Sequence, residues 1–205
     1  MQNSESSPDR PQSAPSSANP CHVCPWWLGY LLTSPIRRLL TSPVKILAPH
    51  VRQGMTVLEP GPGMGFFSLE LARLVGGSGH VVAVDVQPRM LSELRRRASK
   101  AGVLDRLDTR LATPDSLGLA DLTGCVDFTL AFAVVHELPD AARFFGEVAR
   151  ASKPGARLLF VEPAGHVNAS HFEAEVQKAR DAGFRPVESP PPRRGNTALL
   201  ERVGP

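Results

Sequence analysis

From Gly54 onward, short apolar runs alternate with segments that are apolar on one helical face, and this alternation constrains the fold more than any other feature. Near-continuous apolar strands separated by amphipathic helices are typical of a parallel sheet covered by helices on both faces. We therefore expect a doubly wound α/β domain. The expected strands lie at residues 56–58, 81–84, 108–112, 126–134 and 157–161, and the helices at 67–75, 90–101 and 140–153.

The end of the chain departs from this alternation. A capping box of Ser170 and Glu173 predicts a helix that runs to Ala182. Two strands are then predicted close together, at 185–189 and 197–203, with turn residues and no helix between them. Strands joined in this way pair in opposite directions. We expect an antiparallel strand pair to be added to the parallel sheet.

The first predicted strand ends in a glycine-rich loop, Glu59-Pro60-Gly61-Pro62-Gly63-Met64-Gly65. Glycines let a backbone turn sharply and approach a ligand without a Cβ in the way. The helix that follows offers unpaired N–H groups to the same ligand. Asp85 ends the second strand, 20 residues after Gly65, where a carboxylate can accept hydrogen bonds from ribose hydroxyls. A nucleoside-containing ligand is therefore expected here.

The spacing of the loop narrows the class of ligand. A dinucleotide site needs a third small residue, and the bulky Phe66 occupies that position. The chain also lacks the Gly-Lys-Ser/Thr sequence of a nucleotide-triphosphate loop. The alternative is a tight turn in an α/β domain that binds nothing. The partner carboxylate of Asp85 favours binding over that alternative.

From Gly54 to its end the chain resembles the class I S-adenosylmethionine-dependent methyltransferases. The resemblance rests on four stretches: Val57–Gly65, Val84-Asp85, Val126–Leu138 and Lys153–Leu159. It implies a Rossmann-like, mostly parallel seven-stranded sheet with an antiparallel last strand. It also implies S-adenosylmethionine as the cofactor and methyl transfer as the reaction.

The resemblance implies that the glycine loop wraps the methionine part of the cofactor and that Asp85 holds the ribose. Family members often carry an acidic residue against the adenine amino group, near the end of the third strand. Here Ala112 or Thr113 is expected to meet the ring instead, with Asp115 as the alternative. The implied cofactor residues are Glu59, Gly61, Pro62, Gly63, Gly65, Asp85, Val86, Ala112, Thr113 and Ala133.

The reaction leaves the protein two tasks, which are to orient the acceptor and, where needed, to remove its proton. His136 and Glu137 follow the fourth strand and are the candidate catalytic residues, since a histidine can act as a base near neutral pH. A packing role for His136 in the loop remains open. Glu162 and His166, after the fifth strand, are second candidates at the same edge of the sheet.

The part of the chain before Gly54 divides in two. Residues 1–20 are rich in Ser and Pro, so we expect a disordered tail, followed by a helical cap at 21–53 and the methyltransferase domain at 54–205. Trp26, Trp27 and Tyr30 are predicted to form an apolar lid over the acceptor. Simple hydrophobic docking of this segment onto the sheet is equally consistent with the sequence.

Cys21 and Cys24 are the other notable feature of the cap. Two thiols this close can bind a soft metal or a metalloid, or they can anchor the segment as small apolar residues. A zinc site needs more ligands, and only Cys125 remains elsewhere. Two alternative functions follow: a thiol or metalloid methyltransferase that uses Cys21 and Cys24, and a non-catalytic cofactor-binding module. The intact glycine loop favours an enzyme.

Composition limits the partners. The formal charge is only +3, and the basic run at 95–97 falls on a predicted helix face, so nucleic acid is not expected. No apolar stretch reaches the ~20 residues of a membrane span. The odd number of cysteines and the absence of an export pattern favour reduced thiols in the cytoplasm. A small-molecule acceptor is therefore expected, and the oligomeric state stays open.

Overall fold

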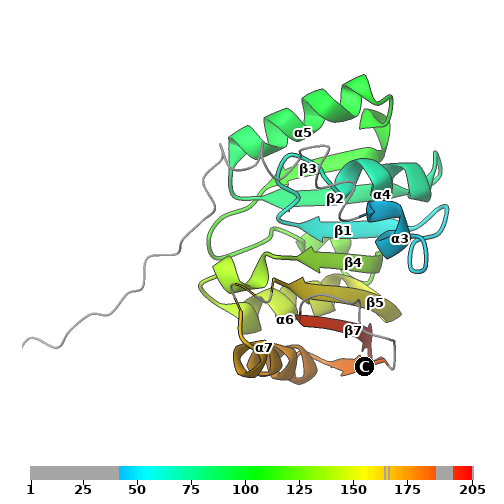
Figure 1. Ribbon diagram of the computed structural model, residues 1–205. Coiled ribbons are helices and arrows are strands. Elements are labelled where there is room, and N and C mark those ends of the chain that lie inside the picture. Colours follow the sequence, from blue (N-terminus) through cyan, green and yellow to red (C-terminus); the bar gives the residue numbers. More distant parts are fainter. Residues whose placement is uncertain (1–41, 164, 166, 188–195, 205) are drawn as a thin grey trace, which may run out of the picture.

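A seven-stranded sheet forms the centre of the computed structural model, which describes residues 42–163, 165, 167–187 and 196–204. The strand order is β3-β2-β1-β4-β5-β7-β6 (Figure 1). The first five strands pair in parallel, and β7 pairs antiparallel with both β5 and β6. The strands are β1 (Thr56–Pro60), β2 (His80–Asp85), β3 (Leu107–Leu111), β4 (Val126–Phe132), β5 (Ser152–Glu162), β6 (Phe184–Pro186) and β7 (Asn196–Arg202).

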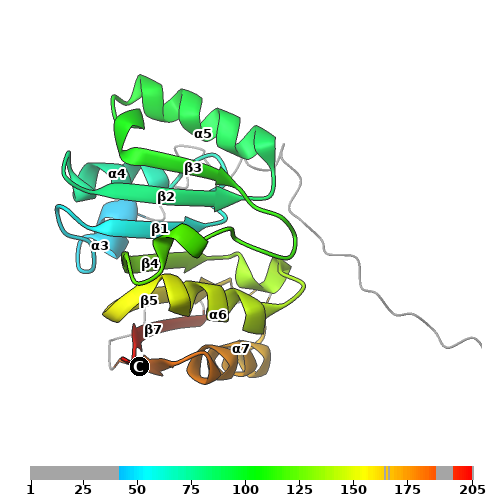
Figure 2. The same ribbon diagram turned by 180° about the vertical axis from the view of Figure 1, so that it is seen from behind.

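Helices cover both faces of this sheet. On one face lie α3 and α4, and α6 lies on the other, as the two opposite views show (Figures 1 and 2). The described helices are α3 (Pro43–Leu47), α4 (Ser68–Val75), α5 (Pro88–Lys100), α6 (Ala141–Ala151) and α7 (Ala169–Asp181), with 3-10 turns η1 (Leu104–Arg106), η2 (Ala120–Leu122) and η3 (Val135–Glu137). The predicted doubly wound parallel sheet with an antiparallel end is confirmed.

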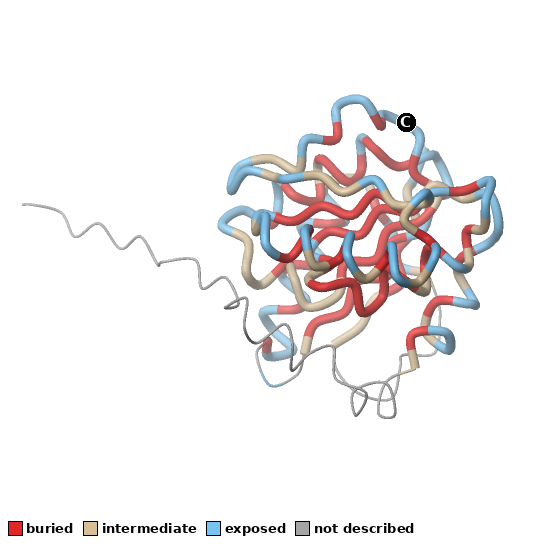
Figure 3. The backbone as a smooth tube through the Cα atoms, turned by 90° about the horizontal axis from the view of Figure 1, so that it is seen from above, coloured by how far each residue is buried: buried red, intermediate tan, exposed pale blue. Residues whose placement is uncertain are grey.

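The inner strands β1, β2 and β4 are largely apolar because both of their faces are buried. Successive residues point to opposite faces of a sheet. Val57 therefore joins the core under α3 and α4, and Leu58 joins the core under α6. Leu159 and Leu158 divide between the two cores in the same way. Figure 3 shows the result, with buried strands between half-exposed helices.

The fifth strand begins earlier than the sequence predicts. Lys153-Pro154-Gly155 is typical of a helix end, and α6 does end at Ala151. The backbone then enters the sheet at once, since Ser152 pairs with Val126. The register shifts before the next pairs form, and Gly155 takes a φ of 79°. An irregular stretch of this kind absorbs extra residues without breaking the strand.

The predicted capping box of the last helix is wrong. Asn168 is the N-cap of α7, and its side chain accepts a hydrogen bond from the backbone N–H of His171 at 2.8 Å. The Ser170 hydroxyl donates to Asn168 Oδ1 at 2.8 Å instead of capping. Asn is among the strongest N-cap residues, which explains the earlier start. The strand after this helix, Phe184–Pro186, begins one residue earlier than predicted, and residues 188–189 of the predicted strand lie outside the described residues.

Most of the predicted N-terminal segments lie outside the described residues. These are the tail at 1–20 and the part of the cap at 21–41, including Trp26, Trp27, Tyr30, Cys21 and Cys24. Within the described part of the cap, α3 begins at Pro43, and Pro is favoured at the first helical position. None of the helices in the described part of the chain is both long enough and apolar enough to cross a membrane.

We expect the ring of Phe160 to hold the sheet to the helices on the α6 face. The side chain is fully buried, with ring centroids 5.5 Å from Phe145 and 4.9 Å from Phe172. Phe160→Ala should lower the free energy of unfolding by about 3–5 kcal/mol because it leaves a cavity. Urea denaturation measures this loss. The exposed Val44→Ala serves as the control, and an equal loss in the two variants would contradict the prediction.

Candidate active site

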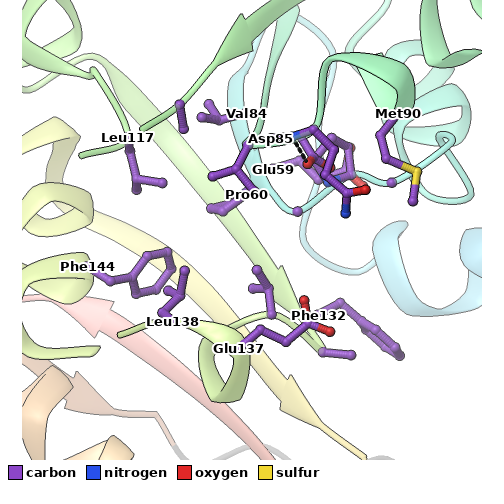
Figure 4. Close-up of a pocket in the computed structure, with 18 of the residues that line it drawn as sticks. Glu59, Pro60, Val84, Asp85, Met90, Leu117, Phe132, Glu137, Leu138 and Phe144 are labelled. Atoms are coloured by element: carbon purple, nitrogen blue, oxygen red, sulfur yellow. Dashed lines mark hydrogen bonds between the residues drawn. The ribbon is translucent and has the colours of Figure 1, made fainter. Parts of the chain in front are cut away.

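A cavity of about 670 Å³ opens at the carboxyl ends of β1, β2 and β4. This volume is in the usual range for sites that bind small molecules and cofactors. Parallel pairing places all of these strand ends at one edge, where α/β sheets bind their ligands. Glu59 and Asp85 line one side of the cavity, and Glu137 lies across from them (Figure 4).

The glycine loop forms one wall. Gly61 has a φ of 66°, and a Cβ at this position would come within 2.6 Å of the Val134 side chain. Gly63 has a φ of 53°, and a Cβ there would meet no heavy atom within 4 Å. Gly61 therefore lets the loop pack against the segment after β4. Gly63 leaves open space beside its backbone, and this space suits the close approach of a ligand.

The third predicted glycine has a different position. Gly65 does not line the cavity, unlike Gly61, Pro62 and Gly63. Its φ is 85°, and a Cβ would come within 2.4 Å of Leu94 Cδ1 on α5. Gly65 therefore brings α5 close to the loop. Arg97, also on α5, donates a hydrogen bond to the backbone carbonyl of Met64 and so ties the loop to this helix.

Glu59 is a buried acid in the cavity wall. Its Oε2 has no hydrogen-bond partner within the described part of the chain. Burial raises the pKa of Glu59 to about 7, and the charge of Asp85 adds to the rise. The Ser68 hydroxyl opposes it in part, although Ser68 Oγ is not in full hydrogen-bonding geometry. An unpaired buried acid suits a ligand that brings a cation or a donor.

Asp85 is held in a defined orientation at the end of β2. Its Oδ1 accepts a hydrogen bond from the backbone N–H of Gln87 at 2.9 Å. Burial raises the pKa of Asp85, and backbone N–H groups of Gln87, Gly63 and Val86 oppose that rise. The carboxylate therefore lies beside Gly63 on the cavity wall. A fixed acceptor at this place suits the hydroxyl groups of a sugar.

The segment after β3 forms the far end of the cavity. Ala112, Thr113 and Asp115 all line it, as does Val86 after β2. The Ala112 N–H donates to the Asp85 carbonyl at 3.0 Å, which extends the strand pairing into the cavity wall. The sequence leaves three candidates for the adenine contact, and all three lie along this wall.

Glu147 of α6 holds this segment in place, a role that sequence reasoning missed. Its Oε2 accepts hydrogen bonds from Ser116 Oγ at 3.1 Å and from the Leu117 N–H at 2.9 Å. Glu147 is buried and lines the cavity. The sequence signal that could have identified Glu147 is a carboxylate on the apolar face of a predicted helix, beside Phe144 and Val148.

The chain leaves β4 through a strained residue. Ala133 has a φ of 55°, the one positive φ outside glycine among the described residues. Its N–H donates to the Val161 carbonyl at 2.8 Å, so the turn is tied to β5. Ala133 lines the cavity. Strain of this kind persists only where surrounding contacts enforce it, and it gathers at functional sites.

His136 lies in η3, immediately after this turn. Its Nδ1 is 2.6 Å from Glu162 Oε2, and the hydrogen bond to this buried carboxylate raises the pKa of His136, with partial opposition from desolvation. Glu162 Oε1 accepts the backbone N–H groups of Val135 at 2.9 Å and His136 at 3.2 Å. His136 and Glu137 both line the cavity. Glu162 thus holds the backbone of η3 at two positions and the ring of His136. The other second candidate, His166, lies outside the described residues.

Three aromatic rings form an apolar wall. Phe66, Phe67 and Phe132 all line the cavity. The ring centroids of Phe67 and Phe132 are 4.7 Å apart, and those of Phe66 and Phe67 are 4.9 Å apart. The sequence indicated only that Phe66 rules out a dinucleotide loop. Its contribution to a cavity wall depends on the pairing of β1 with β4, which brings Phe132 beside Phe67.

Of the cysteines considered as metal ligands, Cys125 is the one within the described residues. Cys125 is exposed and free, and it precedes β4, at the edge of the sheet opposite the cavity. Within residues 42–163, 165, 167–187 and 196–204, no group of three or more His, Cys, Asp or Glu side chains could hold a metal ion. Cys21 and Cys24, with the predicted lid residues, lie outside these ranges.

The raised pKa of Glu59 predicts how stability depends on pH. The folded state holds this proton more tightly than the unfolded chain, so its stabilising effect is complete below about pH 4.5 and is lost as the pH rises through about 7. Glu59→Gln should lack this loss. The difference in the free energy of unfolding, variant minus parent, should therefore increase by on the order of 3 kcal/mol between pH 4 and pH 8.

Urea denaturation at a series of pH values measures this difference, and subtracting the parent cancels the contributions of other groups. The exposed Glu173→Gln is the matched control. A difference that does not change with pH would show that Glu59 has an ordinary pKa in the folded protein.

A family profile described as the methyltransferase domain matches residues 58–160. Curated relatives include an arsenite methyltransferase of Halobacterium salinarum, 32% identical over 129 residues, which are 63% of this chain and 32% of the relative. A ubiquinone/menaquinone biosynthesis C-methyltransferase of Brucella canis is 32% identical over 116 residues, 57% of this chain and 42% of the relative. The chain thus matches less than half the length of these relatives.

Solved structures share the fold. A SAM-dependent methyltransferase from Aquifex aeolicus superposes with a TM-score of 0.74 and 26% identity, over 86% of this chain and 96% of that one. An arsenic(III) S-adenosylmethionine methyltransferase from Chlamydomonas reinhardtii gives a TM-score of 0.60 at 20% identity, over 76% and 65% of the two chains. The chain belongs to the methyltransferase domain family and is built on the fold of the class I S-adenosylmethionine-dependent methyltransferases.

Proposed function

We propose that this chain transfers a methyl group from S-adenosylmethionine to a small, largely apolar acceptor, and that His136 removes a proton from that acceptor. One observation carries the proposal: the cavity that the glycine loop and Asp85 line also contains a histidine whose ring is held by a buried carboxylate. The glycine loop and Asp85 suit the cofactor. The histidine with its carboxylate partner suits a base.

The residues on the first side fit the cofactor. The open space beside Gly63 admits the methionine part against the backbone, and the unpaired Glu59 suits a cationic group there. Asp85 would accept hydrogen bonds from the ribose. Val86, Ala112 and Thr113 would flank the adenine, and Ala133 would lie beside the centre of the cofactor.

S-adenosylmethionine supplies a methyl group on a positively charged sulfur, which is already a strong electrophile. The chain therefore needs only to orient the acceptor and take up its proton. His136 Nδ1 is engaged by Glu162, so proton exchange with an acceptor would use Nε2. Glu137 lines the same side of the cavity and is the second candidate base.

The aromatic wall indicates the kind of acceptor. Phe66, Phe67 and Phe132 offer ring faces and edges, which suit an apolar or aromatic molecule. A weakly acidic hydroxyl or ring carbon on such a molecule would need a base. The relative named as a quinone-biosynthesis C-methyltransferase is consistent with this class. We also propose that the cap at 21–53 closes the site through Trp26, Trp27 and Tyr30.

A thiol or metalloid acceptor is the alternative, because one relative is named as an arsenite methyltransferase. That reaction would need Cys21 and Cys24 at the cavity. The third thiol, Cys125, lies at the opposite edge of the sheet, which counts against a three-thiol site. A non-catalytic cofactor-binding module is a further alternative, although the base and its buried partner argue for catalysis. An odd number of cysteines argues against a disulfide framework, and we place the activity in the cytoplasm, where thiols stay reduced.

Cofactor binding is tested at Asp85. We expect S-adenosylmethionine or its demethylated product to bind with micromolar affinity, and Asp85→Ala to weaken binding at least about tenfold through loss of a charged acceptor. Titration calorimetry measures both values. Asp105→Ala, an exposed aspartate away from the cavity, is the control. Absence of binding in the parent would refute the cofactor assignment.

Catalysis is tested at His136. Labelled methyl transfer into a panel of thiols, phenols, amines and metalloids should identify an acceptor. With that acceptor, His136→Gln should lower kcat about 100-fold by removing the base, and the Kd of the cofactor should stay unchanged. Cys125→Ser is the control and should keep full activity. Turnover of His136→Gln within twofold of the parent would rule out the proposed base.

A further inference from the structure

The carboxylate of Glu162 hydrogen-bonds to His136, and Glu162 is not among the residues that line the cavity. We propose that Glu162 is a positioning residue that keeps the proton of the neutral imidazole on Nδ1, so that Nε2 receives the proton of the acceptor. This inference rests on the proposed function, because it concerns the same base.

The position of Glu162 is set by the fold. It is the last residue of β5, and its side chain is 0% exposed. Its Oε2 lies 2.6 Å from His136 Nδ1, a separation typical of a charge-assisted hydrogen bond. Its Oε1 accepts the backbone N–H groups of Val135 and His136. One carboxylate therefore holds both the backbone of η3 and the ring that η3 carries.

This contact decides which ring nitrogen can act as a base. A neutral imidazole carries its proton on one nitrogen and accepts at the other. A carboxylate only accepts hydrogen bonds, so His136 Nδ1 is the donor toward Glu162 and Nε2 is the acceptor. If Glu162 were replaced, this preference for the Nδ1–H form over the Nε2–H form of the ring would be lost.

One base is enough for the proposed methyl transfer. The bond between the proton and the acceptor atom breaks, the proton goes to Nε2, and its electron pair stays on the acceptor atom. That pair forms the new bond to the methyl carbon, while the bond between carbon and sulfur breaks with its pair on sulfur. The imidazolium, with Glu162 at Nδ1, then returns the Nε2 proton to solvent.

Other charged groups near His136 raise its pKa less than Glu162 does. Glu137 lies on η3 itself, and the buried Glu175 of α7 faces the ring from the next element. Glu175 is engaged elsewhere, since its Oε1 is 3.2 Å from His171 Nε2. The hydrogen bond from Glu162 is the largest influence that raises the pKa of His136. Glu162 hydrogen-bonds to the ring, whereas Glu175 influences the ring through its charge.

If Glu162 only stabilised the structure of η3, its contact with the ring would not need to be a hydrogen-bond acceptor. The backbone N–H groups of η3 need only an oxygen, whereas the Nδ1–H form of the ring needs an acceptor on the other side. Glu162→Gln separates the two. Its amide oxygen can still accept the backbone N–H groups, and its NH₂ group would donate to Nδ1. That donation forces the ring proton onto Nε2, where it blocks the base.

The experiment compares the parent, Glu162→Gln and Glu175→Gln by ¹⁵N NMR of the histidine rings, with the full chain and without an acceptor. We expect the Nδ1–H form of His136 in the parent and in Glu175→Gln, and the Nε2–H form in Glu162→Gln. An Nε2–H ring in the parent would overturn the proposal directly, whatever the folding of the variants.

Kinetics with the identified acceptor supply the second measurement. We expect Glu162→Gln to lower kcat about 100-fold with an unchanged Kd for the cofactor, and Glu175→Gln to stay within twofold of the parent. Because the base must be deprotonated, activity rises with pH through the pKa of His136. Loss of Glu162 lowers that pKa, so the acidic limb of the pH–rate profile should move to lower pH.

The outcomes separate this inference from the proposed function. If His136→Gln loses turnover but Glu162→Gln keeps the Nδ1–H form and the parent pH profile, the positioning role is wrong and the proposed base stands. If His136→Gln keeps full turnover, the proposed base is wrong, and this inference is overturned with it.

Discussion

The rest of the structure depends on the parallel pairing of β1 with its neighbours β2 and β4. Parallel strands run in the same direction, so their carboxyl ends lie at one edge of the sheet. Asp85 ends β2, Glu59 lies one residue before the end of β1, and His136 follows β4, yet all three line one cavity. Burial on both faces makes this arrangement stable, because β1, β2, β4 and β5 each contribute apolar side chains to two cores.

The cavity edge is also where the molecule departs from low-energy structure. Ala133 takes a left-handed backbone conformation, and Glu59 is buried without a hydrogen-bond partner for Oε2 among the described residues. Each feature costs stability in the protein alone. The surrounding strands enforce both, since the Ala133 N–H is bonded to β5 and Glu59 belongs to β1 itself. Costs concentrated in this way favour the view that a ligand compensates them.

Buried carboxylates recur around the cavity, and each connects two elements. Asp85 connects the end of β2 to the segment before α5. Glu147 connects α6 to the segment after β3, and Glu162 connects β5 to η3. In each case the carboxylate accepts backbone N–H groups that regular secondary structure leaves unpaired. These contacts tie the loops of the site to the neighbouring strands and helix, and the contact from Glu162 fixes the position of the proposed base.

Much of the fold could be read from local pattern. Apolar runs marked β1, β2 and β4 because burial on both faces favours apolar residues at most positions. The glycine loop was visible because a positive φ, as at Gly61 and Gly63, strongly favours glycine. The start of β5 and the cap of α7 were missed, since turn residues and competing cap residues look alike without the partner strand or the helix axis.

The sequence by itself determined the order of strands and helices, the glycine loop with its partner Asp85, and the presence of a histidine after β4. Only the tertiary structure decided what lies next to these groups. Glu162 stands 26 positions from His136 in the chain, and no local pattern links them. Glu147 is likewise 30 positions from the Leu117 N–H that it holds. Such contacts arise from the pairing of β4 with β5 and the packing of α6, which bring distant residues within hydrogen-bonding distance.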